Sequence, residues 1–399
     1  MSNPICTNYI DEYGNDLGSV LVSKQYMLEN YSNLLPQDKI PSLWVWGINT
    51  GGVLGDNTAV AKSSPVQTIS GGTNWKQISA SGLNSAGIKT DGTLWLWGSN
   101  ARGQLGDNTV IDKSSPVQTI SGGTNWKQIA LGGSSIYVNA VAIKNDGSLW
   151  NWGYNGQATL GDGTFSYRSS PVQTVAGGTN WSSIAAAQGN TSAIKTDGSL
   201  WIWGSNSFGC STRTCSPIQL TSSVTWKQVS INRYFGAGIK IDGSLWTSGR
   251  NTCGQLGNGT TTDCLNGFVG PVCSSYDWKQ VSTGPDYVVS TKIDGTLWSW
   301  GSGCCCATMN STTKLSPTQI AIGTSNWRQV SADKDGYSVG AIKTDGTLWV
   351  WGDNAAGQLG DNTTVNKCST IQTVVNSYCW KQLSMGGNHA MAILSSEDF

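Results

Sequence analysis

The side chains that most often perform acid–base and nucleophilic chemistry are scarce in this sequence of 399 residues. Its one histidine, His389, would have to carry any Ser-His-Asp triad alone, and it cannot build a histidine-rich zinc site. No G-x-x-x-x-G-K phosphate loop is present. The Gly-Asp-Asn-Thr segments at Gly55, Gly106 and Gly360 supply one carboxylate each, which predicts turns rather than calcium loops. We therefore expect a structural His389 and no enzyme activity, cofactor or metal.

Ten of the eleven cysteines lie between positions 210 and 379. Cys210 and Cys215 bracket a shortened loop, whereas Cys253 and Cys264 bracket a long one. Cysteines at the ends of irregular segments are typical of disulfides, so we expect the pairs Cys210–Cys215 and Cys253–Cys264. A metal site made of thiols alone is the alternative, but no C-x-x-C pair supports it.

Aromatic and charged residues outside the repeated pattern described below are the better candidates for binding. Tyrosine and arginine are favoured at interfaces because they bury a large area and still form hydrogen bonds. The alternative is that such side chains fill gaps beneath loops. The candidate binding residues, all in loops of variable sequence, are Tyr137, Arg168, Arg233, Tyr234, Phe235, Tyr287, Asp335 and Tyr337.

The elements that must position these residues recur about every fifty positions. A Leu-Trp pair occurs seven times, at Leu43, Leu94, Leu149, Leu200, Leu245, Leu297 and Leu348. Each repeat offers four strands, with sequences such as WKQIS, SAGIK, TLWLWG and SPVQTI. This period and strand content predict a β-propeller in which the tryptophans pack between blades. The loops after WKQIS and TLWLWG share one face of each blade, and they carry almost all of the sequence variation.

The Asp-Gly turn between the second and third strands occurs only six times. Residues 388–394 resemble a second strand with no turn after it, and residues 43–47 resemble a third strand with no turn before it. Pairing these segments would complete a seventh blade and remove two free sheet edges. We predict an all-β fold over residues 42–399: a seven-bladed β-propeller of four-stranded antiparallel blades, closed by pairing of the N- and C-terminal strands.

The repeats resemble the regulator of chromosome condensation (RCC1) family. The resemblance is carried by residues 341–352, AIKTDGTLWVWG, and residues 354–361, NAAGQLGD, and it covers about residues 42–394. It implies a seven-bladed propeller. The founding member of the family exchanges nucleotide on a small GTPase and docks on nucleosomes, while a bacterial relative inhibits β-lactamases. The shared residues build blades, so no functional residue follows from the resemblance.

Residues 1–41 lie outside the repeats and form a short N-terminal arm, for attachment or for packing on the propeller. The arm is weakly similar to the anchoring arms of phage tail and fibre proteins. Twenty-four basic residues balance twenty-four acidic ones, and many of the basic ones recur evenly with the repeats, so no nucleic-acid-binding patch is expected. No apolar segment is long enough to insert into a membrane, and no signal-peptide pattern opens the chain.

We therefore predict a non-enzymatic binding and structural module. The first hypothesis is an exposed virion protein of a phage tail or fibre, or a cell-surface adhesion protein. It would lie on a virion or extracellular surface and contact a host-surface glycan, a protein partner or a neighbouring subunit through the variable face. The N-terminal arm would attach it to neighbouring virion subunits. The alternative is a soluble, cytoplasmic protein–protein regulator of RCC1-like type, such as an enzyme inhibitor or exchange factor.

Overall fold

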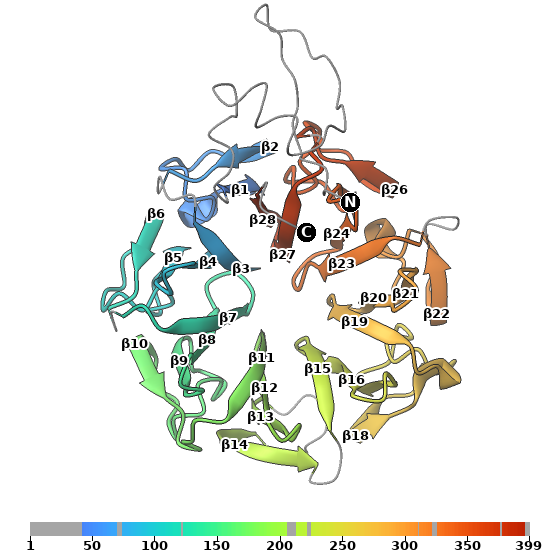
Figure 1. Ribbon diagram of the computed structural model, residues 1–399, viewed down its shortest axis with the longest axis horizontal. Helices are drawn as coiled ribbons and strands as arrows, with labels where there is room; N and C mark the ends of the chain where they lie inside the picture. The colour runs from blue at the N-terminus through green and yellow to red at the C-terminus, as the bar shows by residue number, and fades with distance from the viewer. Residues whose placement is uncertain are drawn as a thin grey trace, which may run out of the picture.

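The computed structural model describes residues 42–395 apart from residues 70–73, 121–122, 206–212, 222–224, 310, 321–324 and 376. Seven sheets of four antiparallel strands surround a central axis (Figure 1). The predicted seven-bladed β-propeller is therefore confirmed. The predicted arm, residues 1–41, lies outside the described residues and stays a prediction.

Six blades are formed by four consecutive strands each, running from the axis outwards. Blade 1 contains β3 (Trp75–Ser81), β4 (Asn84–Lys89), β5 (Leu94–Gly98) and β6 (Lys113–Gln118), and blade 2 contains β7 (Trp126–Gly132), β8 (Asn139–Lys144), β9 (Leu149–Gly153) and β10 (Arg168–Gln173). Blade 3 contains β11 (Trp181–Ala187), β12 (Asn190–Lys195), β13 (Leu200–Gly204) and β14 (Thr214–Thr221), and blade 4 contains β15 (Trp226–Ile231), β16 (Phe235–Lys240), β17 (Leu245–Gly249) and β18 (Cys264–Val269). Blade 5 contains β19 (Trp278–Thr283), β20 (Tyr287–Lys292), β21 (Leu297–Gly301) and β22 (Lys314–Ile320), and blade 6 contains β23 (Trp327–Ala332), β24 (Ser338–Lys343), β25 (Leu348–Gly352) and β26 (Lys367–Gln372). Short 3-10 helices η2 (Thr50–Gly52), η3 (Val272–Ser274) and η4 (Cys304–Cys306) lie in loops.

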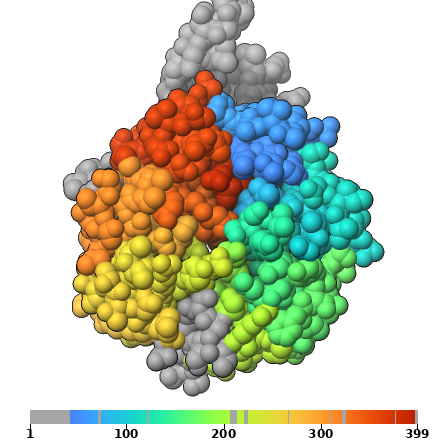
Figure 2. Space-filling model, turned by 180° about the vertical axis from the view of Figure 1, so that it is seen from behind, coloured from blue at the N-terminus to red at the C-terminus, as the bar shows by residue number. Residues whose placement is uncertain are grey.

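Blade 7 joins the two ends of the described chain. It has the order β2 (Lys62–Gln67), β1 (Ser42–Gly47), β28 (His389–Leu394) and β27 (Trp380–Gly386). Strands β1 and β28 pair antiparallel without a break, from Ser42 opposite Leu394 to Gly47 opposite His389. The first and last described segments therefore lie side by side, as the adjoining blue and red sectors of Figure 2 show. The predicted ring closure is confirmed.

Tryptophans pack the joints between blades, as the sequence predicts. In the joint between blades 1 and 2, the buried Trp126 and Trp152 pack with Leu94 and Leu96 of the preceding blade. The Nε1–H of Trp152 also donates to the Gln104 carbonyl of blade 1, at 2.9 Å. Burying such large side chains in every joint supplies the main apolar stabilisation of the ring.

Side chains of the inner strands also connect neighbouring blades, which share no backbone ladder. Gln77 of β3 donates from Nε2 to the Ile129 carbonyl of β7 (3.2 Å) and accepts the Ile129 N–H at Oε1 (3.0 Å). Two residues on, Ser79 Oγ accepts the Leu131 N–H at 2.9 Å. The same two-bond glutamine bridge recurs at Gln228, Gln280 and Gln329. The repeated WKQxS segment is therefore explained by contacts between blades.

The face that carries the Asp-Gly turns, here called the turn face, is nearly the same in blades 1 to 6. In blade 1, Asp91 Oδ1 accepts the N–H of Thr93 at 2.9 Å and its hydroxyl at 2.7 Å. Lys89, just before the turn, places Nζ 5.2 Å from the ring centroid of Trp75 and 4.6 Å from that of Trp95. Equivalent pairs of lysine–tryptophan contacts occur in blades 2 to 6. These lysines are held by ring contacts.

Candidate functional site

The opposite face, here called the loop face, carries the loops between first and second strands and between third and fourth strands. In five blades the second kind of loop is organised by one buried asparagine. In blade 1, Asn100 Oδ1 accepts the Leu105 N–H at 3.0 Å, and its Nδ2 donates to Asp107 and Thr109. The same arrangement occurs around Asn49, Asn155, Asn251 and Asn354. These loops are therefore fixed supports for the side chains that they expose.

A cluster of aromatic rings and arginines lies on the loop face of blades 1 to 3. The Tyr137 and Tyr154 rings meet edge to face with centroids 5.1 Å apart, and Tyr154 and Tyr167 are 5.4 Å apart. The Arg102 guanidinium lies 4.9 Å from the Tyr167 ring centroid. We call this cluster, together with the neighbouring pair Phe165 and Arg213, the aromatic patch; its members are Arg102, Tyr137, Tyr154, Phe165, Tyr167 and Arg213.

The patch combines exposed apolar surface with unpaired positive charge. Phe165 is 54% exposed and Tyr167 is 44% exposed, although both rings are held by arginine contacts. Within the described residues, neither Arg102 nor Arg213 forms an ion pair. The pKa of Tyr154 is raised, first by burial and then by Tyr167 and Tyr137, so its hydroxyl stays neutral at physiological pH.

A second, smaller cluster lies on the loop face of blade 4. The Arg233 and Arg250 guanidinium groups lie 4.9 and 5.6 Å from the Tyr234 ring centroid. Arg233 also donates from Nη1 to Gln188 Oε1 of blade 3 at 3.3 Å. We call these three residues (Arg233, Tyr234 and Arg250) the Tyr234 cluster. It repeats the chemistry of the aromatic patch, a partly exposed ring between arginines.

One loop on this face crosses the central axis. Residues 333–337, between β23 and β24 of blade 6, are here called the plug loop. Lys334 Nζ donates to the carbonyls of Leu131 in blade 2 (3.2 Å) and Ala186 in blade 3 (2.6 Å). The other contacts reach blade 1 through Gly82, blade 4 through Asn232, blade 5 through the Tyr287 hydroxyl, which donates to the Asp333 carbonyl at 3.4 Å, and blade 7 through Asn388. A five-residue loop that bonds to all six other blades must lie over the axis.

Burial shifts the pKa values of two side chains in the plug loop. It lowers the pKa of Lys334 to about 8. It also raises the pKa of Asp335 to about 8, with a further contribution from the nearby Asp333. Asp333 itself is fully buried and accepts four hydrogen bonds, from the N–H groups of Asp335, Gly336 and Asn388 and from the Ser338 hydroxyl. These contacts give the loop a structural role, as the link between blades at the axis.

Two predicted binding residues are buried, which corrects their expected place on the exposed loops. Phe235 and Tyr287 are the first residues of β16 and β20, and neither has measurable exposure. This position points into the joint between blades, where blades 1 and 2 bury Asn84 and Asn139. The Tyr287 hydroxyl donates to the Ser338 carbonyl at 2.9 Å. These two side chains support loops and do not present rings to a partner.

The side chains of three further predicted residues are engaged in contacts with other parts of the protein. Arg168 begins β10 and pairs with Asp162, with Nη2 2.8 Å from Oδ2, so it braces a loop. Asp335 belongs to the plug loop and accepts the Gly82 N–H at 3.2 Å. Tyr337 stacks on Tyr287 with centroids 6.0 Å apart and donates its hydroxyl to Asp286 at 2.8 Å. Of the predicted set, only Tyr137, Arg233 and Tyr234 belong to the two exposed clusters.

Tyr154, Arg102 and Arg213 were missed by reasoning from sequence. Tyr154 replaces the serine that follows the third strand in blade 1, Ser99, and this departure from the repeat is a usable signal. The arginines have no such signal, because their importance follows from rings supplied by other segments of the chain.

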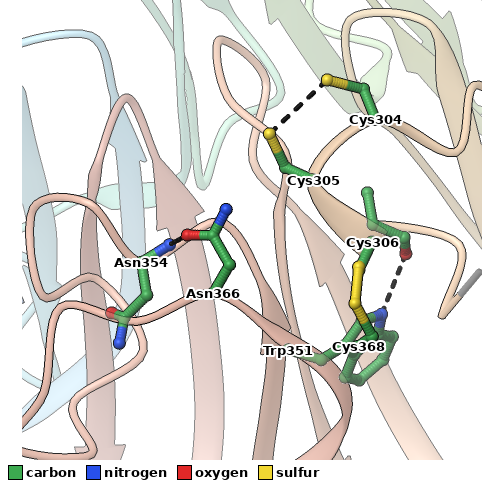
Figure 3. Close-up of a disulfide and its surroundings, with 8 residues drawn as sticks. Cys304, Cys305, Cys306, Trp351, Asn354, Asn366 and Cys368 are labelled. Atoms are coloured by element: carbon green, nitrogen blue, oxygen red, sulfur yellow. Dashed lines mark hydrogen bonds between the residues drawn. A yellow bond between two sulfur atoms is a disulfide. The ribbon is translucent and has the colours of Figure 1, made fainter. Parts of the chain in front are cut away.

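The predicted cysteine pairs do not form. Cys253 and Cys264 are free thiols, and so is Cys215, whose predicted partner Cys210 lies outside the described residues. Cys264 begins β18, where its Sγ is 3.5 Å from the Gly267 carbonyl oxygen, while Cys253 stays in the loop beside Thr252. A disulfide instead joins Cys306 to Cys368, across blades 5 and 6 (Figure 3).

His389 is buried in blade 7, with Nε2 3.1 Å from Ser85 Oγ of blade 1. Burial lowers its pKa to about 4, against 6.5 for an exposed histidine, because the charged ring loses hydration. The imidazole is therefore neutral at physiological pH. This position suits a structural histidine, as the sequence predicts.

This burial should make stability pH-dependent. In the unfolded chain His389 is protonated below about pH 6.5, whereas in the folded protein its imidazole stays neutral down to about pH 4. The free energy of unfolding should therefore fall by about 3 kcal/mol as the pH drops across that window. Urea unfolding at pH 7.5 and 4.5 measures the loss. His389→Asn introduces the residue type that blades 1 and 2 carry at the equivalent position, Asn84 and Asn139. The loss of unfolding free energy in this variant should be smaller than in the wild type by that amount. An equal loss in both proteins would contradict the assignment.

Two kinds of feature are absent from the described residues. In this part of the chain no three histidine, cysteine or acidic residues gather to hold a metal ion. Nor does the described structure contain a helix long and apolar enough to cross a membrane.

Comparison with known families identifies the repeat. Two family models, both described as the regulator of chromosome condensation (RCC1) repeat, match the chain. The first matches residues 91–138 and 345–393. The second matches residues 75–104 and 226–255. The chain carries RCC1 repeats. The matched segments come from blades 1, 2, 4, 6 and 7 and include both kinds of loop.

Several curated proteins are similar in sequence to this chain, and the matches cover very different shares of their lengths. RUG3, a mitochondrial RCC1 domain-containing protein of Arabidopsis thaliana, is 26% identical over 79% of this chain and 75% of its own length. The ultraviolet-B receptor UVR8 of the same plant is 27% identical over 47% of this chain and 43% of its own. The human E3 ubiquitin-protein ligase HERC2 is 22% identical over 96% of this chain, which corresponds to only 8% of HERC2.

Solved structures share the RCC1-like fold. Prp20p of Saccharomyces cerevisiae, a protein described with its binding to Gsp1p and histones, superposes with a TM-score of 0.78 at 14% identity, covering 93% of this chain and 95% of Prp20p. Human WBSCR16 superposes with a TM-score of 0.75 at 16% identity, covering 90% of this chain and all of WBSCR16. At these identities the likeness establishes the propeller alone.

Proposed function

We propose that this RCC1-repeat propeller is a non-enzymatic module that binds a protein partner through the loop face of blades 1 to 4. The observation that carries the proposal is the aromatic patch, in which exposed rings and arginines are fixed against one another before any partner arrives. Rigid aromatic and arginine side chains lose little conformational freedom on binding. Their chemistry suits a protein partner, whose surface offers both apolar groups and hydrogen-bond acceptors.

The comparisons favour the soluble regulator over the virion or adhesion hypothesis. RUG3, UVR8 and HERC2 are an RCC1 domain-containing protein, a receptor and a ubiquitin ligase, and none of the three is named as a virion or adhesion protein. Prp20p is described as binding the proteins Gsp1p and histones. A soluble protein–protein regulator is therefore the form of the proposal that the comparisons support, and a glycan or virion-subunit partner has no support among them.

The proposal is tested with partners captured by the intact protein and then measured one at a time. Tyr167→Ala and Tyr234→Ala each remove an exposed ring, and Arg102→Ala removes a patch cation. Each should weaken binding by about 2 kcal/mol, close to thirtyfold, if the residue is an anchor. Unfolding midpoints should stay near the wild-type value, because these rings are substantially exposed.

The matched control lies on the turn face. Ile293→Ala truncates a side chain that is 67% exposed beside the turn between β20 and β21, and it should leave affinity unchanged. Isothermal titration with each purified partner gives the comparison. If Ile293→Ala abolishes binding while the three loop-face variants bind normally, the partner uses the turn face and the proposal is wrong.

A further inference from the structure

Three consecutive cysteines, Cys304, Cys305 and Cys306, form helix η4 on the loop face of blade 5. Cys306 is bonded to Cys368 of β26, with Cα atoms 4.8 Å apart. Cys304 and Cys305 are free thiols, and their sulfur atoms lie 3.5 Å apart, within hydrogen-bonding contact (Figure 3). The loop therefore holds a dithiol directly beside a disulfide that joins two blades.

We propose that Cys304 and Cys305 are a site of reversible thiol–disulfide exchange with small disulfides. The thiolate of Cys304, which is the more exposed, attacks one sulfur of the small disulfide; a mixed disulfide forms and one small thiolate leaves. Cys305 then gives up its proton and attacks the Cys304 sulfur, forming the Cys304–Cys305 bond and releasing the second small thiol. Two protein thiols are oxidised, and one small disulfide is reduced to two thiols.

Contact between the two sulfurs favours the second step. Among the described free cysteines, only Cys304 and Cys305 have sulfurs in contact with each other; the others are Cys215, Cys253, Cys264 and Cys273. A mixed disulfide on one of them would persist until another small thiol removed it, whereas Cys305 is already placed to resolve the one on Cys304. Burial, and then the neighbouring Cys304, raises the pKa of Cys305 to about 11, which supports Cys304 as the first nucleophile.

The geometry of adjacent residues makes the product reducible. Neighbouring Cα atoms across a trans peptide are about 3.8 Å apart, which is shorter than the roughly 4.4 Å minimum of ordinary disulfides. A bond between Cys304 and Cys305 is therefore strained and easily reduced, and strained, exposed disulfides are the labile class. The Cys306–Cys368 pair spans 4.8 Å and lies in the ordinary range. The loop would thus combine a lasting cross-link with an exchangeable pair.

The test treats the full chain with oxidised glutathione, alkylates the remaining thiols and locates every modification by mass spectrometry. In the wild type, Cys304 and Cys305 should lose both alkylation sites together and carry no glutathione. Mild reduction should restore both thiols and leave Cys306–Cys368 intact. Cys305→Ser should instead trap a stable glutathione adduct on Cys304, because the resolving sulfur is gone.

Cys253→Ser is the matched control, because Cys253 occupies the repeat position of Cys305 in blade 4 but is preceded by Thr252. It should leave oxidation of the pair unchanged. If Cys305→Ser does not fold, Cys304→Ser serves instead, and it should leave residue 305 free of glutathione. A lasting adduct on Cys304 in the wild type would overturn the proposal. So would full alkylation of both thiols under conditions that modify Cys253 or Cys273.

Discussion

Removal of residues 388–399 is expected to prevent the ring from closing. The deletion takes away β28, which pairs with β27 on one side and β1 on the other. It also removes the buried Met391 and Ile393, which belong to the same core cluster as Trp75 of blade 1. Loss of a central strand should cost on the order of 10 kcal/mol, as much as the total stability of many domains. We expect insoluble protein, or a soluble species with a greatly lowered melting temperature.

The matched control deletes only residues 396–399, which removes no described strand. Size-exclusion chromatography and thermal unfolding compare the two truncations with the wild type. Adding a peptide of residues 388–395 to the longer truncation should raise its melting temperature, because a free strand can fill the gap between β27 and β1. A soluble monomer that lacks residues 388–399 and melts like the wild type would contradict the closure of blade 7 by β28.

Asp333→Ala is expected to destabilise the protein by about 3 to 5 kcal/mol, the cost of breaking a buried charged network. The substitution removes the acceptor of four hydrogen bonds, and the Asp335 and Gly336 N–H groups lose their partner inside the plug loop. It also removes the Asn388 contact between blades 6 and 7. Asp333→Asn keeps one acceptor oxygen and should lose less. Urea unfolding measures both changes.

Asp353→Ala is the comparison for this prediction, because Asp353 lies on the same face in blade 6 but accepts only two hydrogen bonds from described residues, from Ala355 N and Gln358 Nε2. Its cost should stay below about 1 kcal/mol, as for most partly exposed positions. Equal unfolding midpoints for Asp333→Ala and wild type would show that the plug loop does not brace the ring.

The blades could be predicted because their stabilising residues recur. Every repeat buries the same tryptophan and leucine positions, so one repeat supports the interpretation of the next. The closing strand pair could be predicted for the same reason, since a missing turn is visible only against six present ones. The disulfide between Cys306 and Cys368 was missed by reasoning from sequence, although these cysteines occupy the repeat positions of Gly103 and Ser169. A Cβ on Gly103 would lie 2.4 Å from the Ser169 Cα, so the two positions are in close contact.

The candidate site was harder to predict because exposure depends on position within the blade and not on residue type. Phe235 and Tyr287 resemble loop aromatics in the sequence, yet the first position of a second strand points into the joint between blades. The plug loop shows a different difficulty. Its partner Gly82 lies 253 positions from Asp335, and no local pattern indicates which of seven similar loops crosses the axis.

Because blade 7 is shared between the first and last described strands, it is the last blade that can be completed during synthesis. Strands β1 and β2 leave the ribosome before any other described strand, but β28 and β27 are made last. Until then β1 and β2 form a two-stranded ribbon with an open edge, which is marginal on its own and prone to pairing with other chains. Blade 7 can therefore close only after β27 and β28 have been made, so the ribbon of β1 and β2 is open to wrong pairing while all the other blades are synthesised.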